Sequence, residues 1–134
     1  MTDPVALNDR IWLSGQISPD DLAETASRLG FRKVVNNRPD HEEPGQPTAD
    51  EIRAAAEAAG LRCLDAPVRG LPDADTVDRV AQFLEDGEPT LMFCRSGMRS
   101  AATWALAQRR RGADADGLRG QALAAGYDLS RLPL

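Results

Sequence analysis

The sequence predicts an α/β fold, a single three-layer domain over residues 1–134 with a central, mainly parallel sheet and helices on both faces. Short apolar runs alternate along the chain with segments whose apolar residues recur at helical spacing. The apolar run that leads to Cys94 has no polar alternation, as expected of a central strand covered on both faces. A chain of 134 residues is long enough to form one such domain.

The first strand is predicted at residues 11–14, and Gly15 closes it. A helix follows, because Ser18 is a good N-cap and Pro19 suits the first helical position. Gly30 ends this helix, which is expected to bury one face. The residues of that face are Leu22, Ala23, Ala26 and Leu29.

The second strand is predicted over residues 31–37. Residues 38–47 form a polar loop, since three prolines and a glycine exclude regular structure there. A capping box that begins at Thr48 starts the second helix, and Gly60 ends it.

The third strand is predicted over residues 61–68, followed by a turn. Asp73 caps the third helix, whose apolar residues have the spacing of a buried stripe, and Gly87 ends it. The fourth strand leads to Cys94. Because ligands of such sheets bind beyond the carboxyl ends of the strands, this cysteine is well placed for function.

Two further helices complete the predicted fold. One begins after the Cys94 loop and ends in the arginine run 109–111, which is interpreted as a solvated helix end. The other is predicted from about Asp116 to Ala125.

Composition excludes several function classes. The net charge of −5 disfavours nucleic acid as a partner. No apolar stretch approaches the ~20 residues that span a bilayer, so no membrane partner is expected. The first residues do not resemble a secretion signal and the two cysteines are too few for a disulfide framework, so the expected location is cytoplasmic. One histidine and two distant cysteines do not make a metal site, and neither a metal nor a cofactor is expected.

The candidate catalytic residues are Cys94 and Arg99. A thiol between a strand and a helix meets backbone N–H groups, the positive end of the helix dipole and two arginines, which all favour the nucleophilic thiolate. Arg99 is expected to neutralise the anionic oxygens of a substrate, and Gly97 is expected to permit a turn with positive φ. The remaining anion-binding loop is predicted to comprise Arg95, Ser96, Gly97, Met98 and Ser100.

The run 94–100 resembles the active loop of single-domain rhodanese-type sulfurtransferases and also the phosphate loop of cysteine-dependent tyrosine and dual-specificity phosphatases. The phosphatase loop has five residues between cysteine and arginine, whereas four separate Cys94 from Arg99, and Ser100 stands where the phosphatase arginine would be. Removing one residue deletes one N–H donor and up to ~3.5 Å of chain. A smaller ring is expected to suit a persulfide or thiosulfate sulfur better than a phosphoryl group.

Three further segments, residues 13–16, 34–40 and 43–47, narrow the resemblance. Together with the Cys94 loop they resemble the beta-lactamase-hydrolase-like, phosphatase-like domain family over roughly residues 8–130. The resemblance implies a cysteine-dependent phosphatase-like fold with a rhodanese-type loop. It also implies sulfide-oxidation enzymes as partners, since some members occur fused to them or near them.

A dual-specificity phosphatase also needs an aspartic acid that protonates the leaving oxygen. In that fold the acid lies in the loop after the strand predicted at 61–68, where the nearest acids, Asp73 and Asp75, look like helix-start residues. Persulfide transfer needs no such acid, because a thiolate or sulfite leaves unaided.

The sequence therefore predicts a sulfurtransferase or persulfide carrier. The Cys94 thiolate would accept sulfane sulfur from a small sulfur-bearing anion or persulfide, such as thiosulfate or glutathione persulfide, and pass it to a thiophilic acceptor. The first alternative is a cysteine-dependent phosphatase with a Cys-phosphate intermediate. The second is a noncatalytic domain that binds anions or a partner protein through the loop.

Polar residues after the second strand are predicted to emerge beside Cys94. Asn37, Arg38 and His41 are candidate pocket residues, with Arg38 either a second anion contact or part of a structural ion pair, and His41 alternatively an exposed loop residue. Cys63 is expected in the core, with a resolving thiol as the alternative.

Overall fold

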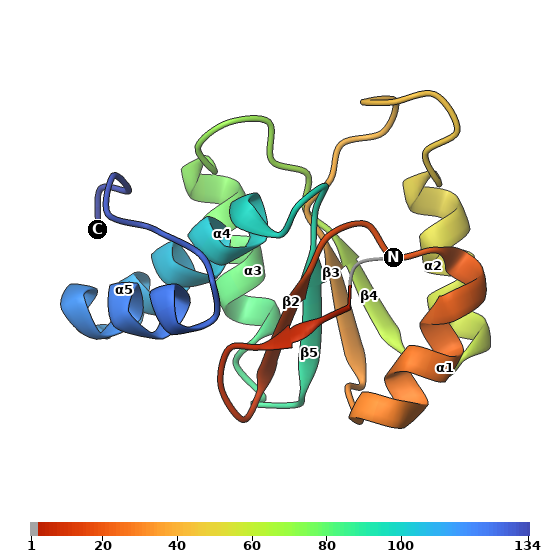
Figure 1. Cartoon of the computed structure of the whole chain (residues 1–134), viewed down its shortest axis with the longest axis horizontal. Coiled ribbons are helices and arrows are strands. Elements are labelled where there is room, and N and C mark those ends of the chain that lie inside the picture. The colour runs from red at the N-terminus through yellow and green to blue at the C-terminus, as the bar shows by residue number, and fades with distance from the viewer. Residues whose placement is uncertain (1–2) are drawn as a thin grey trace.

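A computed structural model describes residues 3–134 of the chain. Across these residues five strands form one sheet, in the order β1-β2-β5-β3-β4 (Figure 1). The strands are β1 (Val5–Ala6), β2 (Ile11–Ser14), β3 (Lys33–Asn36), β4 (Arg62–Asp65) and β5 (Thr90–Phe93). The helices are α1 (Pro19–Leu29), α2 (Ala49–Ala58), α3 (Ala74–Phe83), α4 (Met98–Arg110) and α5 (Ala115–Ala124).

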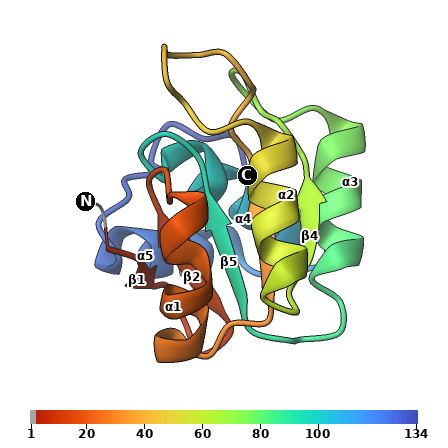
Figure 2. The same cartoon turned by 90° about the vertical axis from the view of Figure 1, so that its right-hand side faces the viewer.

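The sheet is parallel except at one edge, where β1 runs antiparallel to β2. Helices α1 and α2 cover one face, and α3, α4 and α5 cover the other (Figures 1 and 2). This arrangement confirms the predicted α/β fold with three layers and a mainly parallel sheet. In the part of the chain that the structure describes, no helix is long and apolar enough to cross a membrane.

The core lies on both faces of the sheet, as the apolar residues of its central strand require. Successive residues of a strand point to opposite faces, so β5 sends Met92 toward α3–α5 and its neighbours Leu91 and Phe93 toward α1 and α2. All four residues of β5 are buried, which confirms its central position. The candidate nucleophile therefore follows the most enclosed strand.

Local capping explains where the helices begin. Ser18 accepts a hydrogen bond from the Asp21 backbone, and Thr48 forms the predicted capping box. The last helix begins earlier than predicted, because Asp114 caps it through the Gly117 N–H.

Several predicted boundaries and faces were wrong. The β3 and β4 strands are four residues each, shorter than predicted, and the β1 strand was not predicted at all. The third helix ends at Phe83 rather than near Gly87. In α1, Ala23 is exposed and Thr25 is buried instead, because residues three and four positions from Leu22 share its face of the helix and the next residue does not.

The loops that follow the parallel strands meet at the carboxyl edge of the sheet. The Cys94 N–H donates to the carbonyl of Ser14, at 3.4 Å, and the Asn37 N–H donates to the carbonyl of Phe93, at 2.8 Å. The Val68 N–H in turn donates to the Asn37 carbonyl, at 2.9 Å. Backbone bonds thus bring the ends of β2, β3, β4 and β5 together around the cysteine loop.

Candidate active site

Cys94 lies directly after β5 and its side chain is fully buried. Its Sγ accepts a hydrogen bond from the Gly97 N–H at 3.1 Å. Gly97 is the N-cap of α4 and has φ 98°, a left-handed conformation that glycine adopts without steric cost. The next N–H, that of Met98, donates to the Ser96 hydroxyl at 3.4 Å, and the positive end of α4 lies beside the thiol.

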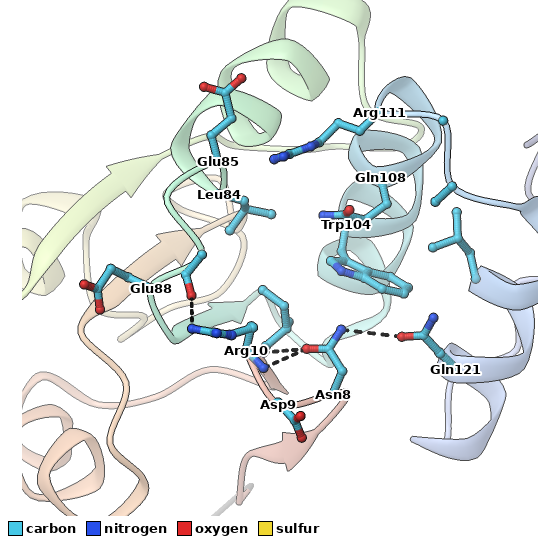
Figure 3. A pocket seen from close by; sticks show the side chains of 15 residues that line it. Asn8, Asp9, Arg10, Leu84, Glu85, Glu88, Trp104, Gln108, Arg111 and Gln121 are labelled. Carbon is cyan, nitrogen blue, oxygen red and sulfur yellow. Dashed lines mark hydrogen bonds between the residues drawn. The ribbon is translucent and has the colours of Figure 1, made fainter.

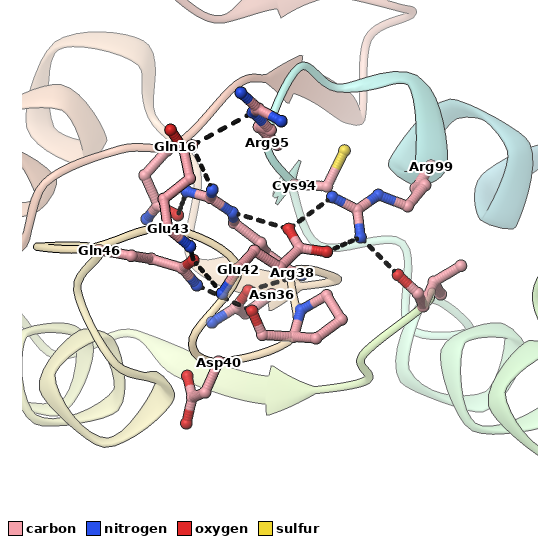
Figure 4. A network of polar contacts seen from close by, with 12 residues as sticks. Gln16, Asn36, Arg38, Asp40, Glu42, Glu43, Gln46, Cys94, Arg95 and Arg99 are labelled. Carbon is pink, nitrogen blue, oxygen red and sulfur yellow. Dashed lines mark hydrogen bonds and ion pairs between the residues drawn. The ribbon is translucent and has the colours of Figure 1, made fainter. Parts of the chain in front are cut away.

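Arg99, in the first turn of α4, is held by two acceptors from other loops. Its Nη1 donates to the Glu42 carboxylate at 2.7 Å and to the Val68 carbonyl at 2.7 Å. Its Nη2 donates to the other oxygen of Glu42 at 2.8 Å. Figure 4 shows this network with the cysteine beside the guanidinium.

These bonds occupy one side of the guanidinium and leave the other available. A guanidinium has five N–H donors, of which Glu42 and Val68 take both on Nη1 and one on Nη2. The remaining fork consists of Nε–H and the second Nη2–H, and no oxygen within residues 3–134 accepts from Nε. Such a fork has the spacing of two oxygens of a carboxylate or phosphate. Arg99 is therefore oriented to bind an oxyanion next to the thiol.

Electrostatics agrees with this geometry. The hydrogen bonds from Arg99 are the main reason that the pKa of Glu42 falls from its usual 4.5 to about 2. The pKa of Arg99 is raised, chiefly by the hydrogen bond to Glu42 and further by the negative charge of the Cys94 thiolate. The pair is ionised at neutral pH, so Glu42 cannot donate a proton there.

Arg38 also contacts the Glu42 carboxylate that holds Arg99. Its side chain is only 4% exposed and donates to Glu42 at 3.0 Å, to Glu43 at 2.6 Å and to Gln16 at 3.1 Å. A buried arginine without such acceptors would be very costly, and these three contacts compensate for its burial. The structure thus gives Arg38 an ion-pair arrangement, the second of the two roles weighed from the sequence.

Loop 38–47 is fixed against the cysteine loop by a second ion pair. Glu43 lies 3.2 Å from the exposed guanidinium of Arg95. Within the loop, Gln46 donates to the Pro39 carbonyl at 2.8 Å, and Asp40 accepts the Ala49 N–H at 2.8 Å. Glu43 and Glu42 of this loop therefore pair with Arg95 of the cysteine loop and Arg99 of α4, respectively.

Asn37 and Ser100 lie inside the protein rather than at the mouth of the site. The Ser100 hydroxyl donates to Asn37 Oδ1 at 2.8 Å, and Asn37 Nδ2 donates to the Ala66 carbonyl at 2.8 Å. Both side chains are buried. They join the first turn of α4 to the ends of β3 and β4, and Ser100 directs its hydroxyl to Asn37 and not to the space above the thiol.

The other predicted residues lie at the surface or apart from the thiol. Ser96 and Met98 are exposed on the cysteine loop. His41 is exposed at the outer part of loop 38–47, where its φ is 65°. Cys63 lies in β4, half-buried against the α1–α2 side of the core, and burial raises its pKa. The arginine run 109–111 is exposed, as expected of a helix end.

Asp73 and Asp75 both lie at the start of α3. Asp73 is the N-cap of α3 and accepts the Thr76 N–H at 2.8 Å, which lowers its pKa. This confirms that it is a helix-start residue. Among residues 3–134, no group of three His, Cys, Asp or Glu side chains is arranged to hold a metal ion.

Two contributors to the site escaped the sequence analysis. Glu42 was not singled out within the polar loop 38–47, although an acidic pair on a loop expected beside two arginines was an available signal. Tyr127, which follows α5, donates its hydroxyl to the Ser96 carbonyl at 3.2 Å. No local pattern indicates this contact, because it depends on how α5 packs against α4.

A large cavity lies at the end of the sheet opposite to Cys94. It has a volume of about 690 Å³ and is bounded by the start of β2, the segment before β5, and helices α4 and α5 (Figure 3). Its described lining has both basic and acidic side chains, such as Arg10, Arg111 and Glu88, and includes no Cys, Ser, Thr, His or Lys. The reactive groups therefore lie in the cysteine loop and not in this cavity.

Comparisons with known sequences identify the family. The sequence profile of the beta-lactamase hydrolase-like protein, phosphatase-like domain, matches residues 4–111. Beta-lactamase hydrolase-like proteins of Xylella fastidiosa and Agrobacterium fabrum are 37% and 32% identical over 106 residues, or 78% of this chain. The chain spans only 24% of the length of these relatives.

Solved structures agree on the fold. A candidate phosphatase from Neisseria meningitidis is 29% identical and superimposes with a TM-score of 0.77, covering 95% of this chain and 91% of its own. Tk-PTP in its active form shares the fold with a TM-score of 0.74 at 21% identity, over 96% of this chain and 89% of its own. PTPMT1 shares it with a TM-score of 0.73 at 14% identity, over 97% of this chain and 85% of its own.

These comparisons confirm the predicted resemblance to the beta-lactamase-hydrolase-like, phosphatase-like domain family. They favour the phosphatase alternative over the sulfur transfer that was predicted first, since the matching family is described as phosphatase-like and the Neisseria protein, at 29% identity, as a candidate phosphatase. The prediction of sulfur transfer rested on a one-residue difference in loop length and the missing acid, whereas the fold matches phosphatases over nearly the whole chain. The chain belongs to the family of phosphatase-like domains of beta-lactamase hydrolase-like proteins.

Proposed function

We propose that this domain is a cysteine-dependent phosphatase that acts on phosphate monoesters through Cys94. The observation that carries the proposal is the free fork of Arg99, which is held beside the thiol by Glu42 and Val68. Two phosphoryl oxygens match that fork, and the Gly97 N–H and the end of α4 add positive potential. Membership of the phosphatase-like family supports the same chemistry.

The reaction would proceed in two displacements. The Cys94 thiolate attacks phosphorus, the S–P bond forms, and the P–O bond to the alcohol breaks, with the electron pair leaving on oxygen. Water then attacks phosphorus, the S–P bond breaks, and inorganic phosphate leaves as the thiolate is restored and the proton passes to solvent. Arg99 neutralises the equatorial oxygens during both displacements.

The acid–base groups of the site restrict the substrate class. Glu42 is ionised at neutral pH, and Asp73 is engaged as a helix cap. A leaving oxygen must therefore depart without a strong proton donor, which an aryl oxide does far better than an alkoxide. We infer a preference for aryl phosphates, such as a phosphorylated phenol or tyrosine side chain.

Sulfur transfer is the second candidate, and the short loop favours it. Four residues separate Cys94 from Arg99, so the ring of N–H donors is smaller than in a loop of five. Thiosulfate or a persulfide would place a sulfane sulfur at the thiolate and release sulfite or a thiolate, neither of which needs protonation. Such a substrate would use the same Arg99 fork.

Mass spectrometry of the intact protein separates the two candidates. After a rapid quench with an aryl phosphate, the phosphatase proposal expects an adduct of one phosphoryl group and steady release of phosphate. Both should vanish in Cys94→Ser and persist in the matched variant Cys63→Ser. Incubation with thiosulfate or glutathione persulfide tests the second candidate. An adduct of one sulfur atom on Cys94, with no phosphate release from any aryl phosphate, would overturn the proposal.

A further inference from the structure

Tyr127 lies against the cysteine loop although it is distant in sequence. It follows α5, its side chain is half-buried, and its hydroxyl donates to the Ser96 carbonyl at 3.2 Å. It is the only tyrosine of the chain and lies beyond residue 111, where the family match ends.

The carbonyl that Tyr127 contacts belongs to the peptide unit that contacts the thiol. The carbonyl of Ser96 and the N–H of Gly97 are two ends of one planar amide. This N–H donates to Cys94 Sγ at 3.1 Å. A continuous chain therefore runs from the phenol hydroxyl through one amide to the sulfur.

The two sides of this contact fit closely. A Cβ atom at residue 97 would overlap the Tyr127 hydroxyl, so the absence of a side chain at Gly97 lets the phenol reach the loop. Burial raises the pKa of Tyr127, and the negative charge of the Cys94 thiolate raises it further. The phenol and the sulfur are thus close enough to influence each other electrostatically.

We propose that Tyr127 is a positioning residue that stabilises the Cys94 thiolate through the Ser96–Gly97 amide. A hydrogen bond accepted by the carbonyl of an amide polarises it and strengthens the bond that its N–H donates. It also holds the plane of the amide so that the N–H points at sulfur. The inference rests on the proposed nucleophilic role of Cys94 and adds a group from outside the matched family region.

Within residues 3–134, the other charged groups around the thiol make no hydrogen bond with the phenol hydroxyl. Arg99 approaches from α4 with Glu42 behind it, and Arg95 lies on the cysteine loop paired with Glu43. Tyr127→Phe keeps the ring that packs against the core and deletes only the donor. The variant therefore isolates the effect of one hydrogen bond.

Alkylation of Cys94 by iodoacetamide tests the inference in a Cys63→Ser background, without any need for phosphatase activity. The thiolate is the reacting form, so at about pH 6 the Tyr127→Phe variant should react about two- to threefold more slowly than its parent. Its pH profile should move to higher pH with an unchanged plateau. Leu123→Ala, an exposed change on α5, should match the parent.

In the alkylation experiment, three outcomes would overturn the inference: coincident pH profiles, a faster reaction of Tyr127→Phe, or an equal loss of rate at every pH, which indicates general loosening of the loop.

The reciprocal measurement follows the titration of the single tyrosine by its ultraviolet absorbance. Cys94→Ser should lower the pKa of Tyr127, since the thiolate charge is gone. An unchanged tyrosine titration would also count against the proposed coupling. If alkylation behaves as expected while aryl phosphates are not hydrolysed, the proposed function fails and the role of Tyr127 stands.

Discussion

The carboxylate of Glu42 and the guanidinium of Arg99 share two parallel hydrogen bonds, 2.7 and 2.8 Å long, between residues 57 positions apart in the sequence. A bidentate ion pair of this kind fixes the orientation of both side chains. The pair leaves the Nε edge of Arg99 for a substrate. Glu42 is thus expected to act as a support for Arg99 that does not compete with the substrate.

Glu42→Gln should lower kcat/KM for an aryl phosphate by about tenfold, equivalent to about 1.4 kcal/mol, because the neutral amide holds Arg99 less firmly. Glu43→Gln is the matched control, since Glu43 pairs with Arg38 and Arg95 and does not contact Arg99. Steady-state kinetics of both variants makes the comparison. Equal losses in the two variants, or a gain of activity in Glu42→Gln, would contradict a supporting role.

The ion pair of Glu42 should also appear in the pH dependence of stability. Its pKa is lowered from 4.5 to about 2 in the folded protein, so its contribution is fully present above about pH 4.5 and is lost as the pH falls through about 2. The difference in free energy of unfolding between the wild type and Glu42→Gln should therefore be constant near neutral pH and shrink in acid. Urea unfolding at a series of pH values measures it. Glu24→Gln, an exposed change on α1, should show no such trend, and a difference for Glu42→Gln that persists at pH 2 would refute the assignment.

Ser100→Ala should reduce the free energy of unfolding by about 1–3 kcal/mol, because the buried Oδ1 of Asn37 loses its donor. Chemical denaturation gives this value directly. Ser27→Ala, at an exposed position of α1, provides the control and should change stability by less than about 0.5 kcal/mol. A similarly small change at Ser100 would mean that the hydrogen bond contributes little.

Gly97→Ala should destabilise the protein by about 1–3 kcal/mol and slow alkylation of Cys94, since a side chain there is strained at φ 98° and overlaps the Tyr127 hydroxyl. Gly70→Ala is the matched control, because Gly70 has open space around its Cα and no positive φ. Thermal or urea unfolding and iodoacetamide rates provide the measurements. Adding Tyr127→Ala to Gly97→Ala should recover part of the lost stability, as it removes the overlap but not the backbone strain. Wild-type stability in the single variant would contradict this account of the loop.

Local features of the sequence determined most of the fold. Ser18, Thr48 and Asp73 cap helices through hydrogen bonds to residues three positions away, so each start could be predicted from a few neighbours. The same is true of Cys94, which a central apolar strand delivers to the start of a helix. The β1 strand escaped prediction because it is two residues long and exists only by pairing with β2.

The tertiary structure decided how the site is assembled. Whether Arg38 binds a substrate or the carboxylates of Glu42 and Glu43 depends on how two loops cross at the edge of the sheet. The contact of Tyr127 with the Ser96 carbonyl depends in the same way on the packing of α5. Caps and hydrophobic periodicity act between near neighbours and can be read from the sequence. Contacts between side chains distant along the chain are fixed only when the packed sheet and helices set the distances between loops.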